Sequence, residues 1–380
     1  MKKVLWILIF LLTVTVQAEE LQDVIEEQLD LSGVDGISIE NNGYQDVFGS
    51  FEMENMTSNL ATGKWSWNPS DILKKGISFF FKEVYANIKL MLQVIILVLI
   101  TSVITTIQGS FGSKGVGEAG FFACYILIVG IIIKGFTFAA SLGSQFVTTL
   151  DSFIKVFVPT MMVLVASSGA ALSAAAFQPV LLIASQLIGV AIKDVLMPLL
   201  FLAMAMNMAD NISTKFNMTR FVKLIHNIIK WSLGIMLTVF VGIITLQSLA
   251  APALDGIGGK TAKYAVSTFV PVVGKILTDT LDLVAGSSLI IKNSVGVAGI
   301  LAIVVMCFVP LVQVLAQISI FALSAAVVEP IADKRIVKCI SGVSETLTLL
   351  FIMMLSQEIM FIINIAIVVS AGSNAAMLGR

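Results

Sequence analysis

Charged side chains within apolar stretches are the residues of this sequence whose types and spacing could do chemistry. The clearest group is Lys275, Asp279 and Asp282, which are four and three residues apart and so share one face of a helix. A charge that faces lipid near the bilayer centre costs at least about 2.5 kcal/mol. We therefore expect the stretch that contains this group, residues 261–299, either to lie on the membrane surface or to face a wet, protein-lined space.

Further charges and four prolines interrupt other apolar stretches. Intramembrane charges indicate a water path or a buried ion pair that fixes the fold. Prolines free backbone carbonyls that can line a cavity, although simple kinks leave the same signature. The candidate polar path consists of Lys193, Asp194, Lys275, Asp279, Asp282 and Glu358, and the candidate helix breaks are Pro159, Pro198, Pro271 and Pro310.

Patterns typical of enzymes and metal sites do not fit their context here. A GxGxxG sequence at 115–120 follows no strand and precedes an apolar segment, so it does not predict a dinucleotide site. His226 is the only histidine, and the three cysteines have no metal-ligand spacing. No basic run suggests nucleic acid. We predict no enzyme, no catalytic residue, no cofactor and no metal.

The composition is that of a membrane protein. Of the 380 residues, 57% are hydrophobic and 12% charged, whereas soluble domains contain about 25% charged residues. The mean hydropathy is +0.99. The sequence therefore predicts an all-α, polytopic protein whose helices contact the lipid bilayer.

The amino-terminal part differs from the rest of the chain. Lys2 and Lys3 precede an apolar run that ends near Ala18, as in a cleavable signal peptide, with an uncleaved anchor as the alternative. An acidic region follows, and then two tryptophans and an aromatic, lysine-containing helix that begins at Asn68–Pro69. The predicted divisions are a signal peptide at 1–18, an acidic extracytoplasmic region at 19–67, an interfacial helix at 68–87 and a multi-pass domain at 88–380.

Six full crossings are expected. The loops at 210–230 and 329–338 are rich in lysine and arginine, which places both in the cytoplasm by the positive-inside rule. The predicted crossings are 88–107, 119–141, 179–209, 228–250, 294–328 and 341–370.

An approximate internal repeat relates two parts of the multi-pass domain. Each repeated motif is offset by 112 residues: VGII at 129 and 241, FVP at 157 and 269, and PL at 198 and 310. The repeat units are about 119–215 and 231–327. A repeat with one orientation needs an even number of crossings. We therefore predict that the proline-broken segments 145–177 and 257–292 are re-entrant and do not cross.

These features resemble one family. The order of signal peptide, acidic region, tryptophan-containing entry helix and multi-pass domain is similar to that of stage III sporulation protein AE of endospore-forming bacteria. Residues 261–299, together with VASSG at 165–169 and MPLLFL at 197–202, also look like this family. The likeness extends over essentially the whole chain. No catalytic residue is transferred with it.

The resemblance implies a place and a machine. Members would lie in the mother-cell membrane around the forespore, as part of the channel, or feeding tube, that joins the two cells. Partners would be the other stage III A sporulation proteins and, across the intermembrane space, the forespore protein Q apparatus. One hypothesis is a subunit that forms or lines a transport path. The others are a non-conducting scaffold for the channel complex and an autonomous secondary transporter.

Overall fold

The computed structural model describes residues 69–110, 114–212, 218–269 and 274–378, together with Phe48, Thr57 and Leu60. Within these residues the secondary structure is helical and contains no strand. The predicted signal peptide, almost all of the acidic region and Pro271 lie outside the described residues. The all-α prediction is confirmed.

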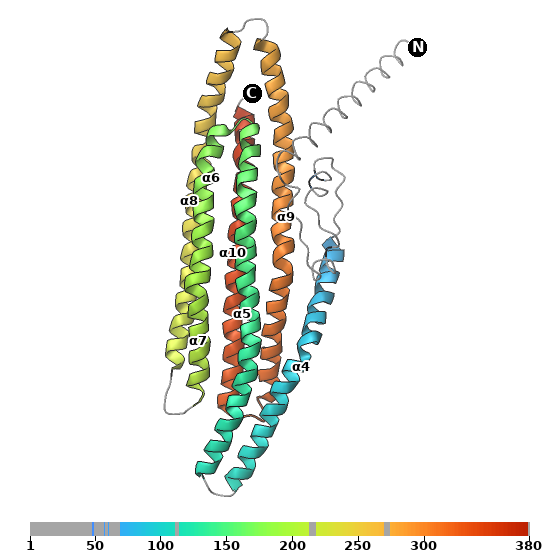
Figure 1. Ribbon diagram of the computed structural model, residues 1–380, viewed down its shortest axis with the longest axis vertical. Coiled ribbons are helices and arrows are strands. Elements are labelled where there is room, and N and C mark those ends of the chain that lie inside the picture. Colours follow the sequence, from blue (N-terminus) through green and yellow to red (C-terminus); the bar gives the residue numbers. More distant parts are fainter. Residues whose placement is uncertain are drawn as a thin grey trace, which may run out of the picture.

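Long helices run up and down in an elongated bundle (Figure 1). The longest has 55 residues, which corresponds to roughly 80 Å at 1.5 Å per residue. Helix α6, the π-helical turn η2 and helix α7 follow one another without a loop and act as one rod. The elements are α4 (Pro69–Ser110), α5 (Lys114–Ser167), α6 (Ala171–Val190), η2 (Ala191–Leu196), α7 (Met197–Asp210), α8 (Thr219–Phe269), α9 (Gly274–Val328) and α10 (Lys334–Leu378).

Six helical rods in the described part of the chain are long and apolar enough to cross a membrane, and each overlaps one predicted crossing. The first begins where Pro69 opens α4, as the Asn68–Pro69 pair predicts. The six rods are Ser70–Ile107, Glu118–Ser167, Ala171–Asp210, Thr219–Gln247, Ser288–Val328 and Lys334–Ser370.

Helix α10 forms the centre of the bundle and lies behind α5 in Figure 1. It packs against α5, α6, α7, α8 and α9. Apolar side chains along its length, including Leu347, Leu350 and Phe361, are completely buried. Helix α4 lies at the edge, where it contacts α5 and α9 and diverges from α5 toward α9 (Figure 1). The upper half of α5 is therefore not covered by α4.

The two basic loops lie at the same end of the bundle, because the α7–α8 and α9–α10 connections both join helices there (Figure 1). The prediction that they share one side is confirmed. The α4–α5 connection is at this end too. The α5–α6 and α8–α9 connections are at the opposite end, where the α8–α9 hairpin reaches farther than its neighbours (Figure 1).

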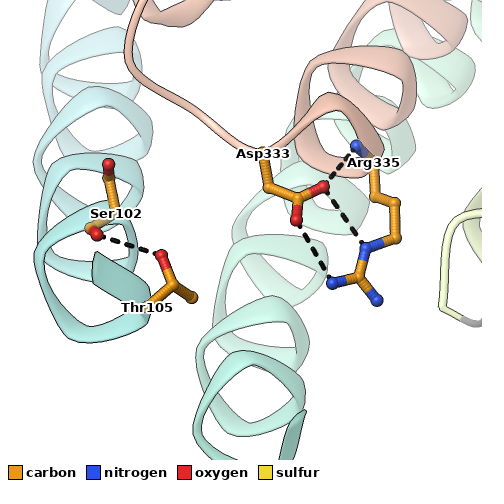
Figure 2. Close-up of polar contacts among 4 residues, drawn as sticks. All are labelled: Ser102, Thr105, Asp333 and Arg335. Atoms are coloured by element: carbon orange, nitrogen blue, oxygen red, sulfur yellow. Dashed lines mark hydrogen bonds and ion pairs between the residues drawn. The ribbon is translucent and has the colours of Figure 1, made fainter. Parts of the chain in front are cut away.

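Polar contacts fix the α9–α10 turn at the basic end (Figure 2). Asp333 accepts the backbone N–H of Arg335 at 2.8 Å and pairs with its guanidinium at 3.2 Å, so Asp333 caps α10. Burial raises the pKa of Asp333, but the hydrogen bonds and charge of Arg335 outweigh it and keep that pKa below its usual value. The Arg335 guanidinium also lies 3.6 Å from the centre of the Phe121 ring of α5. Ser102 of α4, whose carbonyl accepts Thr105 in Figure 2, donates to the Ile331 carbonyl at 2.7 Å.

The prediction of a separate broken segment at 145–177 is wrong. Helix α5 continues through Pro159 to Ser167, and the chain turns only at 168–170. Gly169 has a φ of +93° there, and the Ala170 N–H bonds the Val165 carbonyl at 3.3 Å, as expected where a left-handed glycine ends a helix. Proline is tolerated inside transmembrane helices, and Pro159 leaves α5 continuous although it cannot donate to the Lys155 carbonyl four residues earlier.

Pro310 also lies inside a continuous helix, α9, so it is not a break either. The predicted segment 257–292 comprises the end of α8 and the beginning of α9, and residues 270–273 between them lie outside the described part. The predicted segment 145–177 thus contains the α5–α6 turn, and the re-entrant character of both segments stays a prediction. The ends of the helices do not reproduce the offset of 112 residues, since α5 ends at Ser167 and α8 ends at Phe269, 102 residues later. The internal repeat therefore stays a prediction.

Candidate functional site

Within the bundle, α10 carries a buried row of polar side chains. Asn364 donates to the Ser185 hydroxyl of α6 at 2.8 Å, and Thr346 lies 3.4 Å from the His226 ring of α8. The Lys292 amine of α9 donates to the Val369 carbonyl at 2.8 Å. These contacts join α10 to three neighbouring helices. Hydrogen bonds of this kind stabilise helix association in membranes by about 0.6 kcal/mol each.

Two members of this row have a different environment. Gln357 is completely buried, and neither its amide oxygen nor its amide nitrogen has a hydrogen-bond partner among the described residues. Leu350 and Asn364 lie seven residues, or two turns, on either side of Gln357 and so on the same face of α10. Leu350 packs against Gly143 of α5, and Asn364 bonds Ser185 of α6. Gln357 therefore faces α5 and α6. Glu358, the next residue, is 8% exposed.

Helix α5 carries a polar face on the outer surface of the bundle, on the side that Gln357 faces from the interior. Between residues 141 and 155 of α5, every exposed side chain is polar, whereas the buried positions are glycine or apolar. The segment spans about 21 Å of helix. Its exposed residues are Ser141, Gln145, Thr148, Thr149, Ser152 and Lys155.

Helix α8 at the same height is different. Thr346 of α10 contacts His226 of α8, and one turn farther along α10, Leu350 packs against Gly143 of α5. Positions on α8 that follow His226 therefore lie at the same height along the bundle as positions on α5 that follow Gly143. The exposed side chains of α8 there include Ile235 and Val239, which are 58% and 53% exposed. Apart from the exposed Lys230 and Thr238, helix α8 thus presents an apolar surface suited to lipid at the height where α5 presents a polar one.

A groove of about 230 Å³ between α5 and the α6–η2 rod forms the charged part of the polar face. The Lys155 amine lies 2.6 Å from the Asp151 carboxylate, and the Lys193 amine donates to the Thr148 hydroxyl at 3.4 Å. The second carboxylate oxygen of Asp151 is buried and has no partner among the described residues. The polar groups that line the groove are Thr148, Asp151, Lys155, Gln186, Lys193 and Asp194.

Pro198 explains why the rod is π-helical beside the groove. Proline has no N–H and its ring clashes with the carbonyl four residues earlier, which is that of Asp194. The helix widens before this point, and the Met197 N–H bonds the Ile192 carbonyl instead. Such single π-helical turns are frequent at functional sites. Of the three predicted breaks that lie among the described residues, Pro198 is the one that coincides with an irregular helix.

The predicted path residues lie in three places. Lys193 and Asp194 line the groove, and Glu358 lies in the bundle interior. Lys275, Asp279 and Asp282 lie in the first turns of α9.

The α9 group is far from the groove. Gly299 of α9 packs against Phe157 of α5, and Asp282 precedes Gly299 by 17 residues, or about 25 Å of helix. The six predicted residues therefore do not form one path within a single chain.

Sequence reasoning missed Asp151, Lys155 and the uncharged members of the polar face. The signal was present, because the sequence SLGSQFVTTLDSFIK at 141–155 alternates polar and apolar residues with the period of a helix. The groove needs the neighbouring rod as well, which joins residues 45 apart in sequence, such as Thr148 and Lys193.

Comparison with known proteins identifies the family. A family model described as Stage III sporulation protein AE matches residues 51–372. The chain is 30% identical over 316 residues to Stage III sporulation protein AE of Bacillus subtilis (strain 168), which covers 83% of this chain and 79% of that relative. No solved structure matches. This is therefore a multi-pass membrane protein of sporulation, and the chain belongs to the stage III sporulation protein AE family.

Proposed function

We propose that this protein is a membrane component of the channel complex between mother cell and forespore, and that its polar face lines part of the transport path. The observation that carries the proposal is the exclusively polar exposed surface of α5 between residues 141 and 155, within a rod that is otherwise apolar enough to cross a membrane. Lipid does not solvate such a surface, so water or protein must cover it.

Two groups behind the polar face support a wet environment. The free carboxylate oxygen of Asp151 and the amide of Gln357 are buried without partners among the described residues. A polar group left in this state costs about 1–3 kcal/mol. Water that enters from the groove would remove this cost for Asp151 directly, and Gln357 faces the same two helices.

The remaining expectations for the family complete the proposal. The protein lies in the mother-cell membrane around the forespore, its amino-terminal region projects into the intermembrane space, and it acts with the other stage III A proteins and the forespore protein Q apparatus. Positively charged loops favour the cytoplasm, so the basic end of the bundle faces the mother-cell cytoplasm. The opposite end, with the α8–α9 hairpin, then faces the forespore.

The buried contacts of α10 favour a second candidate function, a scaffold that organises the complex without conducting. Lys292, Asn364 and Thr346 each join α10 to another helix, as expected of groups that fix the fold. In this case the polar face would bind a protein rather than line a path. The two functions differ in what limits sporulation when the polar face is changed.

Substitution of Thr148 and Ser152 by leucine tests the path directly. The double variant is expected to accumulate in the membrane and to assemble with its partners, while a late forespore reporter stays inactive because the lining has become apolar. A matched control is Thr238→Leu on α8, since Thr148 and Thr238 are both exposed and both donate to the carbonyl four residues earlier. Loss of the complex together with the reporter would support the scaffold. Normal reporter activity and normal spores would contradict both roles.

A further inference from the structure

The charges in the groove are balanced but incompletely paired within one chain. The groove holds two amines and two carboxylates. Lys155 pairs with Asp151, and Lys193 contacts the Thr148 hydroxyl. Asp194 makes no hydrogen bond or ion pair with any described residue, although it is exposed at the middle of a membrane-spanning rod. An exposed carboxylate at this depth requires a counter-charge or water from outside the single chain.

The heights of these charges decide which partner fits. Because Lys193 contacts Thr148, the η2 charges lie within about two turns of Asp151 and Lys155 along the bundle. Two copies of one chain insert into the membrane in the same orientation, so a two-fold axis between them runs along the membrane normal and brings equal heights together. The α5 charges of one copy then meet the η2 charges of the other.

The surface is therefore self-complementary. In such a pair, each Asp151 can face the Lys193 of the second copy, and each Lys155 can face its Asp194. Both contacts occur twice, as a two-fold interface requires. An arrangement with one sign of charge would instead repel a second copy.

We propose that the polar faces of two copies of this protein face each other in the membrane, so that the groove of each supplies half of a shared polar space. This inference deepens the proposed function. It rests on that function for the claim that the shared space is part of the transport path. It places Lys193 and Asp194, two of the predicted path residues, on a conducting surface that lies between copies rather than inside the bundle.

Cross-linking between cysteines tests the arrangement. In a background with Cys124→Ser, Ser152→Cys on the polar face is compared with Val239→Cys on α8, which lies at the same height on the surface suited to lipid. Cys307 and Cys339 are completely buried and are retained. A short bis-maleimide applied to membranes is expected to give at least about tenfold more dimer with Ser152→Cys, because neighbouring thiols have a high effective concentration. Equal yields at the two positions would overturn the proposal.

Charge variants on two differently tagged copies then test the pairing. One copy carries Asp151→Lys and the other Lys193→Glu, both with Ser152→Cys. A homodimer of either variant brings like charges together where position 151 of one copy meets position 193 of the other. The mixed dimer has opposite charges at both of these contacts, because the two substituted positions meet at one contact and the native Asp151 and Lys193 meet at the other. Cross-links are expected mainly between the two tags. A random mixture, or an adduct with a different protein in place of the dimer, would overturn the proposal.

The same strains separate this inference from the proposed function. If dimers form normally and the variant with leucine at positions 148 and 152 still supplies the forespore, the pairing is supported and the path is rejected. The absence of dimers together with a failure of that leucine variant would retain the path and assign its second wall to another protein.

Discussion

Asp151→Lys is expected to leave the protein in the membrane but to stop supply of the forespore. The substitution places a third amine in the groove beside Lys155 and Lys193. Like charges brought together across an interface cost about 3 kcal/mol, which corresponds to roughly a 100-fold loss in the population of the working arrangement. We expect the spore titre to fall by a similar factor. The measurements are heat-resistant spore counts and the amount of protein in the membrane fraction.

A second variant distinguishes charge from damage to the fold. Adding Lys155→Asp to Asp151→Lys exchanges the two ends of the observed ion pair and returns the groove to two amines and two carboxylates. This exchange is expected to recover most of the spore titre. Full activity of Asp151→Lys alone would show that the groove charges have no role, and a failure of the exchange at normal protein levels would show that their order matters.

Gly299→Val is expected to destabilise the bundle by overpacking the contact between α9 and α5. Any side chain at Gly299 would collide with the ring of Phe157, which is 1% exposed and stacks on Phe153 with 5.1 Å between ring centres. Overpacking of a closely packed core costs about 1–3 kcal/mol, or roughly 5 °C in melting temperature for a domain of this size. Thermal unfolding of the detergent-solubilised protein provides the measurement.

The matched control is Gly242→Val on α8. Nothing lies within 4 Å of a side-chain carbon built at Gly242, so this change introduces valine without a collision, and valine is no worse a helix former than glycine. The melting temperature of this variant should stay close to that of the original protein. Equal destabilisation by the two substitutions would mean that α5 and α9 do not pack as described.

The sequence alone was sufficient for the membrane class, the six crossings and the common side of the two basic loops. These features depend on local hydropathy and on loop charge, which need no knowledge of packing. The start of α4 at Pro69 is equally local, because an asparagine followed by a proline favours a helix start whatever the neighbouring helices do.

The path and the breaks depended on packing and were harder to predict. The sequence predicts helix breaks at Pro159 and Pro310, but α5 and α9 are continuous through these prolines. The spacing of Lys275, Asp279 and Asp282 places them on one face of a helix. Nothing in the sequence shows that this part of α9 lies far from the groove. Asp151 and Lys193 join only when two rods pack, so neither position alone indicates the site.

Water access to the polar face is the most direct test of the central claim. Ser152→Cys and Val239→Cys, each in the Cys124→Ser background, lie at one height on opposite kinds of surface. A charged, membrane-impermeant thiol reagent should label Ser152→Cys at least about tenfold faster, because the reactive thiolate forms in water and not in hydrocarbon. Equally slow labelling of both positions, at the rate of a lipid-facing cysteine, would contradict a wet polar face and with it the transport path.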